Sequence, residues 1–344
     1  MREFPYPLLF EPVLKDYVWG GRRLSEMRAG RRPPDRVAES WEVAMHPHGR
    51  SLVAAGPCKG LDLGQLMAAY GEALLGTHGR PYLRRGHFPL LVKVLDAERR
   101  LSLQVHPDDA YAGRHENGSL GKTEMWVILE AGRDAKIVLG LSAPLDRAEF
   151  KHALTEGHIM PWLHHLPVQV GDFVCVPARS LHAILGDIML VEVQQNSDIT
   201  YRAYDWGRPG ASRPLHLRQA LEVIDFGQVR PGLPAVEPLA HDEDRGWQAE
   251  RLCANDYFQV ERYHVAAGGG LERQTEASSL EIWALVAGRA SLGSSGEQAE
   301  FDHLGFVLLP AALGVFGWQA HADATLLRIT LTEPGAVLQR WTAD

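Results

Sequence analysis

Residues 123–126, TEMW, return as LEIW at residues 280–283, and residues 173–178, FVCVPA, return as FVLLPA at residues 306–311. In both halves of the chain the Glu-x-Trp segment comes before the Phe-Val segment. Repetition of strand-like segments in one order is typical of a structural unit that is present twice. We therefore predict two related domains.

Short runs rich in Val, Ile, Leu and aromatic residues, bounded by Gly, Pro, Asn and Asp, recur along the chain and predict strands. They include WEVAM (41–45), PLLVKVL (89–95), EMWVIL (124–129), DFVCVP (172–177) and IMLVEVQQ (188–195). Helical periodicity is confined to residues 61–75, 147–154 and 217–224. The sequence thus predicts a mainly β protein of sandwiches or barrels with a few short helices.

A chain of 344 residues exceeds the roughly 250 to 300 residues at which single cores stop growing. We predict an N-terminal barrel over residues 1–227, with a helical insertion near 61–75, and a C-terminal barrel over 247–344. Residues 228–246, which hold three prolines and an acid cluster, interrupt every periodic pattern and are predicted to be a linker.

Composition excludes several classes of function. The net charge is -8 and no long basic run occurs, so nothing indicates binding to nucleic acid or to an anionic membrane. The N-terminus lacks the pattern of a secretory signal, and no window has the roughly 20 apolar residues of a spanning helix. Cys58, Cys175 and Cys253 are far apart without a CxxC, which favours a reducing cytoplasm over a disulfide framework.

Residues 101–107, LSLQVHP, hold the first of four candidate metal ligands. Gln104 and His106 are two apart in a strand-like run, so both side chains point to one face. Glu124 opens the next run, and His182 ends a G-x5-P-x4-H pattern that begins at Gly171. Imidazole, carboxylate and amide donors suit one Zn²⁺ per chain best, although Fe²⁺, Mn²⁺ and Co²⁺ accept similar sets.

Two other histidine groups compete for this role. His46-Pro47-His48 has no acid or third histidine at barrel spacing, and its proline breaks the strand alternation. His164-His165 lies in what we expect to be a helix end or a loop, where neighbouring side chains do not face one partner. We interpret both groups as solvated histidines.

A dense polar segment runs from Glu192 to Arg202 at the end of a predicted strand. Arg202 can stabilise oxyanion charge, or it can form a surface ion pair with a nearby aspartate. Lys93 is an ammonium in an apolar strand, and with Ser102 and Lys122 it can hold a phosphate. Alternatively, Lys93 extends its ammonium to the barrel rim, and Lys122 is an ordinary loop lysine.

Taken in order, these segments resemble class I mannose-6-phosphate isomerase, a zinc enzyme of the cupin superfamily, and its short bacterial form in particular. The resemblance is carried by residues 13–24, VLKDYVWGGRRL; 39–49, ESWEVAMHPHG; 88–109, FPLLVKVLDAERRLSLQVHPDD; 121–129, GKTEMWVIL; 176–184, VPARSLHAI; and 194–208, QQNSDITYRAYDWGR. It covers most of the chain and implies two cupin-like jelly-roll barrels, the second without a metal.

The resemblance also implies an activity and the residues that carry it. The activity is the interconversion of mannose 6-phosphate and fructose 6-phosphate in the cytoplasm, with a sugar phosphate as the small-molecule partner. The metal-ligand positions fall on Gln104, His106, Glu124 and His182. The catalytic position falls on Arg202, with Glu192 a further active-site candidate, and the phosphate-end positions on Lys93, Ser102 and Lys122.

Two positions depart from the family pattern. Short members usually have a glycine in the turn before the last histidine, whereas this chain has Arg179, which an αL turn would strain. Asn196 stands where Thr or Ala is commoner. In the second copy, Val315 occupies the place of His182, so we expect only the first barrel to hold the metal.

Aldose–ketose interconversion proceeds through an enediol and needs a base and an electrophile near C1 and C2. We predict that the metal polarises the oxygens, Arg202 stabilises the enediolate and Glu192 transfers the proton. Two rival interpretations remain at this point: a non-catalytic sugar-phosphate-binding paralogue, and another metal-dependent cupin such as an oxygenase.

Overall fold

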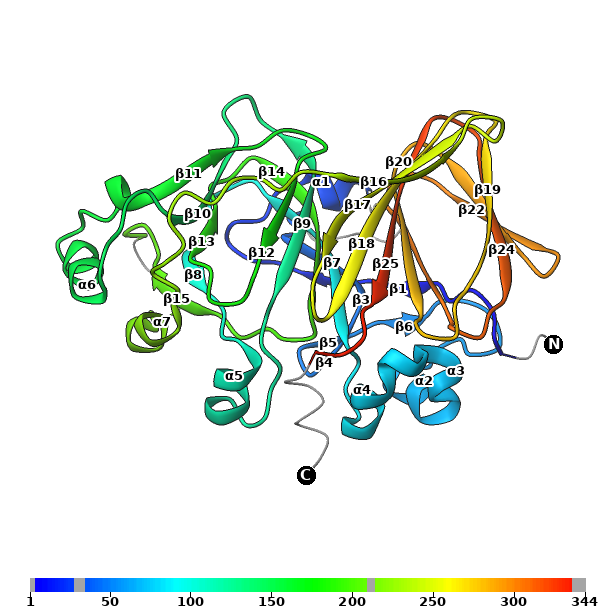
Figure 1. Ribbon diagram of the computed structural model, residues 1–344, viewed down its shortest axis with the longest axis horizontal. Helices are drawn as coiled ribbons and strands as arrows, with labels where there is room; N and C mark the ends of the chain where they lie inside the picture. Colours follow the sequence, from blue (N-terminus) through cyan, green and yellow to red (C-terminus); the bar gives the residue numbers. More distant parts are fainter. Residues whose placement is uncertain (1–3, 28–34, 209–213, 336–344) are drawn as a thin grey trace. The chain divides into compact units, whose positions relative to one another are not determined.

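The computed structural model describes residues 4–27, 35–208 and 214–335. The chain forms two compact units that interleave along the sequence. One, here the metal-ligand unit, comprises residues 14–41 and 91–234. The other, here the C-terminal unit, comprises residues 1–13, 42–90 and 235–344. Each unit is built mainly from two antiparallel sheets, which confirms the predicted fold class (Figure 1).

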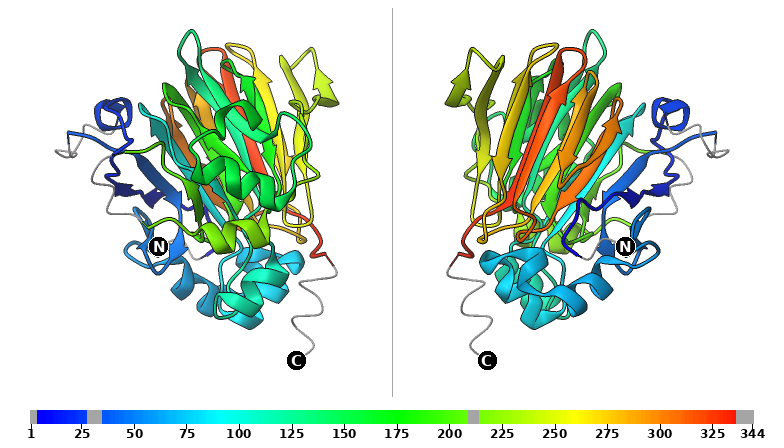
Figure 2. Two further views of the ribbon diagram at one scale, coloured as in Figure 1. Left: turned by 90° about the vertical axis from the view of Figure 1, so that its left-hand side faces the viewer. Right: turned by 90° about the vertical axis from the view of Figure 1, so that its right-hand side faces the viewer.

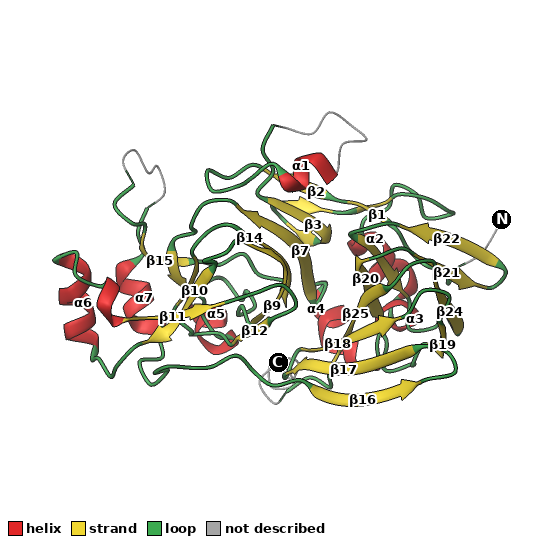
Figure 3. Ribbon diagram, turned by 90° about the horizontal axis from the view of Figure 1, so that it is seen from above, coloured by secondary structure: helices red, strands yellow, loops and turns green. Residues whose placement is uncertain are grey.

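The metal-ligand unit contains a six-stranded and a five-stranded sheet. The first has the order β12 (Phe173–Val176), β9 (Glu124–Ala131), β14 (Ile188–Gln195), β7 (Leu90–Ala97), β3 (Glu39–Val43), β2 (Val13–Lys15). The second has the order β11 (Leu163–Pro167), β10 (Lys136–Leu141), β13 (His182–Ile184), β8 (Leu103–Val105), β15 (Tyr201–Tyr204). Seen from above, these strands curve around one interior (Figure 3).

The C-terminal unit repeats this plan with a six-stranded and a four-stranded sheet. The six-stranded sheet has the order β16 (Glu237–Asp242), β17 (Trp247–Ala254), β18 (Phe258–Val265), β25 (Ala324–Leu331), β20 (Glu281–Ala287), β23 (Gly305–Leu309). The other has the order β19 (Gly270–Gln274), β24 (Val315–Ala320), β21 (Ala290–Ser294), β22 (Glu297–Phe301). Two small pairs, β1 (Phe10–Glu11) with β6 (Leu52–Val53) and β4 (Met45–His46) with β5 (Gly49–Arg50), complete it.

The sequence repeat is also a repeat of strand register. Glu124 of β9 pairs with Val176 of β12, and Glu281 of β20 pairs with Leu309 of β23. In the sequence repeat, Glu281 is the counterpart of Glu124, and Leu309 is the counterpart of Val176. The internal repeat therefore reflects the same strand pairing in both units.

The three predicted helical stretches are confirmed. They form α2 (Leu63–Tyr70) and α3 (Glu72–Leu75), α6 (Arg147–Thr155) and α7 (Leu217–Val223). Asp62 and Asp146 cap α2 and α6, each within a capping box, which explains where these helices begin. In the left panel of Figure 2, α6 stands in front of the strands of its own unit.

Three other helices were not predicted: α1 (Arg23–Met27), α4 (Arg80–Arg85) and α5 (Asp109–His115). All are seven residues or shorter. Helices α1 and α4, of five and six residues, are too short for an apolar period to emerge, and α5, although as long as α7, contains no Leu, Ile, Val, Met or Phe to form one. Single-turn 3₁₀ helices, η1 (Thr77–Gly79) and η2 (Met160–Trp162), also lie in loops.

The expectation for His164 and His165 was wrong. Both lie in strand β11, and His165 pairs with Val138 of β10. Helix α6 has already ended at Thr155. Cross-strand hydrogen bonds from β10, which no local pattern reveals, make this segment a strand.

The helical segment of residues 63–85 belongs to the C-terminal unit. The N–H of Leu280 donates to the carbonyl of Leu75 (3.0 Å), and that of Ala311 to the carbonyl of Leu74 (3.0 Å). Gly76 has a φ of 78° and approaches so closely that a Cβ atom there would lie 2.4 Å from the backbone of Ser278. A residue with a side chain would separate the helices from this barrel.

Residues 237–242 of the predicted linker form β16, which pairs with β17 along its length. The edge position of β16 tolerates Pro238, because one side of an edge strand makes no ladder bonds. The division into residues 1–227, 228–246 and 247–344 stays a prediction. Among the described residues, no helix combines the length and the apolar content needed to cross a membrane.

Aromatic side chains fill the interior of the C-terminal unit. Trp283 lies 5.8 Å from Phe316 and 5.9 Å from Trp318, and Phe301 lies 5.1 Å from Trp318, measured between ring centroids. All four are buried in one cluster. Side chains of this size occupy the space that a barrel of this kind otherwise offers to a ligand.

Candidate metal and sugar-phosphate site

Strand β8 brings three of the predicted site residues together. Gln104 is paired with His182 of β13 on one side and with Arg202 of β15 on the other. Directly opposed residues on antiparallel strands point their side chains to the same face. The five-stranded sheet therefore presents an amide, an imidazole and a guanidinium side by side.

His106, Glu124 and His182 form a buried group whose ligand atoms all lie within 4.8 Å of one another. Nε2 of His106 is 3.3 Å from Oε1 of Glu124, and Nε2 of His182 is 3.7 Å from Oε2 of Glu124. Nε2 of Gln104 is 3.3 Å from Nε2 of His182, and a half turn of the amide would present its oxygen instead. The four predicted ligands are thus assembled in one place.

Backbone carbonyls orient both imidazoles. Nδ1 of His106 lies 2.8 Å from the carbonyl of Ile199, and Nδ1 of His182 lies 2.9 Å from the carbonyl of Ser180. A proton on Nδ1 that donates to these carbonyls leaves the Nε2 lone pair directed at Glu124. Burial, with nearby Lys122, lowers the pKa of His106, and burial lowers that of His182 to about 3. Both rings are neutral at pH 7, the form that binds metal.

Glu124 supplies the negative charge of the group. Its burial opposes ionisation, but the ammonium of Lys122 holds its pKa well below the usual range. Lys122 Nζ contacts Oε1 of Glu124 closely, while Oε2 of Glu124 is buried without a hydrogen-bond partner. A buried carboxylate oxygen without a donor is costly. Two neutral imidazoles, an amide and this carboxylate therefore fit a divalent cation.

A cavity of about 270 Å³ opens beside the ligand group. Its lining includes every predicted catalytic and phosphate-binding residue together with two of the metal ligands: Lys93, Ser102, Gln104, Lys122, His182, Glu192 and Arg202. It also includes residues that the sequence reasoning did not single out: Glu39, Trp19, Trp126 and Asp198. The cavity lies wholly within residues of the metal-ligand unit.

Arg202 is buried, so its guanidinium does not lie on the surface. Its Nε donates to Ser102 Oγ (3.1 Å), and its Nη1 donates to the carbonyl of Pro214 (3.1 Å). Ser102 Oγ in turn donates to Oε1 of Gln104 (3.3 Å). These hydrogen bonds hold the guanidinium at the cavity and connect it, through Ser102, to Gln104 of the ligand group.

Lys93 lies between two carboxylates and is buried. Its Nζ is 2.9 Å from Oε1 of Glu192 and 3.4 Å from Oε2 of Glu39. Burial opposes the charge of Lys93, but the two carboxylates raise its pKa well above the ordinary value. Burial and Glu124 raise the pKa of Glu192, against the opposing effect of Lys93. The indole of Trp126 donates to Oε2 of Glu192 (2.8 Å) and holds it in place.

Arg179 has a positive φ of 74°, the region in which the sequence suggested that an arginine would be strained. Its N–H donates to the carbonyl of His106 (2.7 Å), and its Nε donates to the carbonyl of Val223 (3.0 Å). These two contacts hold an arginine in a backbone conformation that usually favours glycine. The turn thereby connects the segments that carry His106 and His182.

Glu39 is the residue that the sequence reasoning most clearly missed. The signal was present, because Glu39 is an acid at the start of ESWEV, in a strand whose five residues are all buried. An ionisable group in such a strand needs a partner of opposite charge or a functional role. Its partner Lys93 is 54 residues further along the chain, so only the fold reveals the pair.

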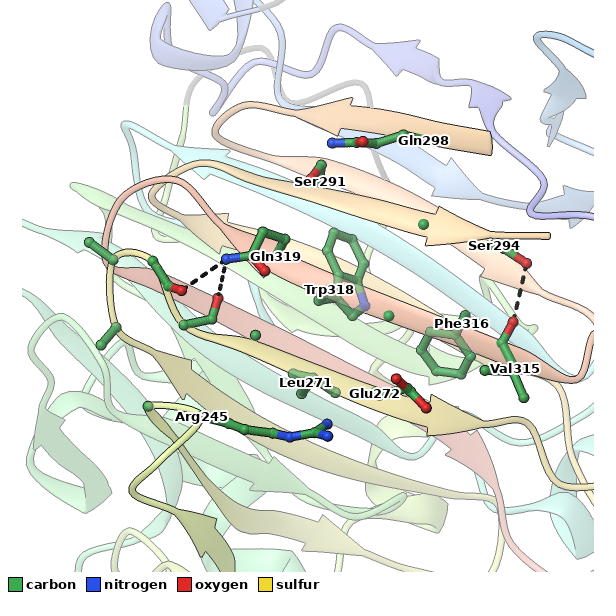
Figure 4. A pocket seen from close by; sticks show the side chains of 18 of the residues that line it. Arg245, Leu271, Glu272, Ser291, Ser294, Gln298, Val315, Phe316, Trp318 and Gln319 are labelled. Atoms are coloured by element: carbon green, nitrogen blue, oxygen red, sulfur yellow. Dashed lines mark hydrogen bonds between the residues drawn. The ribbon is translucent and has the colours of Figure 1, made fainter. Parts of the chain in front are cut away.

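A larger groove, of about 1100 Å³, lies in the C-terminal unit, around residues 243–246, 266–272 and 315–319. Figure 4 shows Glu272, Gln298 and Gln319 among the side chains that line it. None of its lining residues is a histidine or a cysteine. It offers no donor set of the kind found around Glu124.

Comparison with known proteins agrees with this geometry. Residues 8–127 match the family model described as phosphomannose isomerase type I, catalytic domain. The chain is 35% identical to the mannose-6-phosphate isomerase ManA of Bacillus subtilis, over 92% of this chain and 97% of that protein. It is 34% identical to the mannose-6-phosphate isomerase of Streptococcus mutans, over 93% and 97%.

A solved structure shows the same fold. The crystal structure of the mannose 6-phosphate isomerase from Bacillus subtilis superimposes with a TM-score of 0.84 at 30% sequence identity. The match covers 94% of this chain and 99% of that one. The similarity thus extends through both units.

Proposed function

Because the chain belongs to the type I phosphomannose isomerase family, we propose that the cavity beside Glu124 binds mannose 6-phosphate and converts it reversibly to fructose 6-phosphate. The observation that carries this proposal is the buried group of His106, Glu124 and His182 beside a cavity whose lining includes Lys93, Lys122 and Arg202 as well as three acids. An aldose–ketose isomerase needs a cation-stabilised place for enediolate oxygens, and this cavity provides one.

We propose Zn²⁺ as the cation, held by His106, His182, Glu124 and Gln104. When bound, zinc would polarise the oxygens on C1 and C2 as a Lewis acid. The two neutral imidazoles and the single carboxylate favour this borderline ion over Mg²⁺ or Ca²⁺, which prefer all-oxygen ligands. Free thiols at all three cysteines are consistent with the proposed cytoplasmic location.

Glu192 is the proposed base for the proton that moves between C1 and C2. It lines the cavity, and its pKa is raised by burial and by Glu124. A carboxylate of raised pKa is better able to take up a proton near neutral pH. Trp126 limits its movement by donating to Oε2.

Arg202 is the proposed partner of the enediolate charge. It faces the cavity from the strand next to Gln104, and its guanidinium stays protonated at any pH at which the enzyme works. Its contacts with Ser102 and Pro214 hold it before the substrate arrives. A group that is already in position stabilises developing charge without first having to reorganise.

For the phosphate end we propose Ser102 and Lys122, with Lys93 as the least favoured of the three predicted contacts. All three line the cavity. Ser102 is hydrogen-bonded to Arg202, so both are available to one anion. Lys93, in contrast, already has two carboxylates within 3.4 Å, which disfavour a dianion beside it.

The proposal is tested by removing the metal with a chelator and measuring interconversion of mannose 6-phosphate and fructose 6-phosphate before and after addition of Zn²⁺. Turnover should disappear and return. Binding of the sugar phosphate without turnover in the zinc-loaded protein would instead identify a binding paralogue. Oxygen uptake with bound iron would identify another kind of cupin enzyme.

Arg202→Ala tests the proposed catalytic arginine, and Arg208→Ala is its matched control. Arg208 is a partly exposed arginine in the same region whose charged partner is Asp205, outside the cavity lining. Arg202→Ala should lower kcat by about 100-fold or more with zinc content unchanged. Near wild-type turnover of Arg202→Ala with zinc retained would contradict the role.

A further inference from the structure

The carboxylate of Glu39 stands at the cavity in an ordered arrangement of three charges. Strands β14, β7 and β3 are neighbours in the six-stranded sheet, and they carry Glu192, Lys93 and Glu39 respectively. Lys93 is within 3.4 Å of both carboxylates. One ammonium therefore serves two acids, and the group keeps an excess of negative charge.

Only one oxygen of Glu39 is used by the protein. Oε2 accepts from the indole N–H of Trp41 (2.6 Å) and from Nζ of Lys93 (3.4 Å). Oε1 has no hydrogen-bond partner among the described residues. It is also not completely buried. The side chain keeps 11% exposure, and Glu39 lines the cavity. Trp41 and Lys93 thus hold one oxygen, while the other remains available to a ligand.

The charges decide what kind of ligand group this oxygen accepts. A phosphate dianion beside Glu39 would meet two carboxylates opposed by one ammonium, which is unfavourable. A neutral hydroxyl donates to a carboxylate and gains a charge-assisted hydrogen bond. Polar groups that are already in position and lack a partner discriminate strongly against ligands without the matching group.

We propose that Glu39 accepts a hydrogen bond from a hydroxyl of the sugar, and is therefore a specificity-determining residue of the isomerase site. This inference rests on the proposed function, because it takes the ligand to be a sugar phosphate. It assigns Lys93 and Glu39 together to the hydroxyl-bearing part of the sugar. Ser102, Lys122 and Arg202 are then left for the phosphate and the reacting carbons.

The first experiment measures binding of 1,5-anhydromannitol 6-phosphate, which cannot isomerise, to the zinc-loaded protein by calorimetry. Glu39→Gln keeps the shape but replaces one acceptor oxygen by a donor. It should weaken this ligand about 10- to 100-fold. The affinity for inorganic phosphate, measured as a second probe, should change by less than about threefold, since Glu39→Gln takes away no phosphate contact.

The matched control is Glu222→Gln. Glu222 accepts from Tyr111 (2.6 Å) at an exposed position outside the cavity lining, so the same chemical change there should leave both ligands unaffected. If Glu39→Gln weakens the sugar phosphate by less than about threefold, or weakens inorganic phosphate equally, the inference is overturned. Zinc content, measured for each variant, separates a lost contact from a disturbed ligand group.

A second experiment identifies the hydroxyl with analogues of the same ligand that lack the hydroxyl at C2, C3 or C4. The analogue that lacks the contacted hydroxyl should bind to the wild type and to Glu39→Gln with affinities that differ by less than about threefold, since the contact is already absent. If every analogue keeps the full difference between the two proteins, Glu39 makes no direct contact. Neither measurement needs turnover, so a wild type without isomerase activity contradicts the proposed function alone.

Discussion

Glu124 and Glu281 occupy the same register position in the two units, but they have different cationic partners. Each begins a strand that is second from one edge of its six-stranded sheet, β9 or β20, and each stands two residues before a tryptophan. Around Glu124 stand two neutral imidazoles and Lys122. Around Glu281 stands Arg328, whose Nη2 lies 2.6 Å from Oε1 of Glu281.

One contribution to the difference is a cross-strand position. Glu192 of β14 lies opposite Trp126, and Arg328 of β25 lies opposite Trp283. The metal-ligand unit thus has an acid where the C-terminal unit has an arginine. Arg328 also reaches Glu261 (3.1 Å), so its charge compensates two buried carboxylates. Both oxygens of Glu281 accept hydrogen bonds, one from Arg328 and the other from Trp283, whereas Oε2 of Glu124 has no hydrogen-bond partner.

The comparison teaches that a buried carboxylate alone does not make a metal site. What distinguishes the two units is whether the chain supplies a donor to each oxygen of the carboxylate. Arg328 and Trp283 do so for Glu281, whereas Lys122 contacts only Oε1 of Glu124. Breaking a buried ion pair destabilises a protein strongly, because it leaves an uncompensated charge. The C-terminal carboxylate is therefore expected to matter for stability, and the other for chemistry.

The largest expected effect comes from Glu124→Gln. Loss of the only anionic ligand should bring the zinc content close to zero and lower turnover by about 1000-fold or more. Metal analysis and the isomerase assay measure this. Glu281→Gln, the equivalent change in the C-terminal unit, should keep both zinc and turnover in its folded fraction. Stoichiometric zinc in Glu124→Gln would contradict the assigned ligand set.

Next in size is Arg328→Met. It leaves Glu261 and Glu281 without their shared cation and should lower the free energy of unfolding by about 3 to 5 kcal/mol. Urea unfolding followed by tryptophan fluorescence measures this. Zinc per folded chain should be unchanged, because no predicted ligand is touched. A loss below about 1 kcal/mol would show that Arg328 does not hold this unit together.

A smaller effect concerns pH and the metal-free protein. Burial lowers the pKa of His182 to about 3, below the ordinary value of 6.5, so below pH 6.5 the unfolded chain binds a proton that the folded chain does not. The contribution of His182 to the free energy of unfolding is therefore fully present above pH 6.5. It falls as the pH drops towards 3, by up to about 1.4 kcal/mol per pH unit.

Unfolding free energies at pH 7, 6 and 5 test this expectation. His182→Gln should reduce the slope, since it removes a group that titrates only on unfolding. Arg328 contributes no such slope, because Glu281 and Glu261 outweigh burial and raise the pKa of a group that is already charged throughout this range. An unchanged slope in His182→Gln would show that His182 is not the group responsible.

The smallest expected effect is that of Arg179→Gly. Glycine relieves the αL conformation, but the variant loses the bond from Nε of Arg179 to the carbonyl of Val223. Each term is of the order of 1 kcal/mol and the two oppose each other, so stability should change by less than about 1 kcal/mol. A larger loss would mean that Arg179 holds the turn in place.

Much of the fold was predictable because its signals are local. Apolar runs predicted the strands, and the capping residues Asp62 and Asp146 begin helices where the periodic pattern starts. The errors were local too. Short helices such as α5 carry no full period, and His165 is in a strand only because β10 pairs with it.

The candidate site divides in the same way. Alternation along one strand placed Gln104 and His106 on one face, and the repeated Glu-x-Trp segment marked Glu124 and Glu281 as equivalent. The sequence by itself thus determined the family, and it predicted the candidate ligands and two related barrels. These follow from spacing within single strands and from order along the chain.

Only the tertiary structure decided how the buried charges are paired. Glu39, Lys93 and Glu192 come from three strands separated by long stretches of chain, and their contacts depend on strand order and register. The same dependence makes Arg328 the partner of Glu281 and leaves one oxygen of Glu124 without a hydrogen bond. Charge compensation in a protein interior acts over a few ångströms of space, whatever the separation in sequence, and so it is decided by the fold.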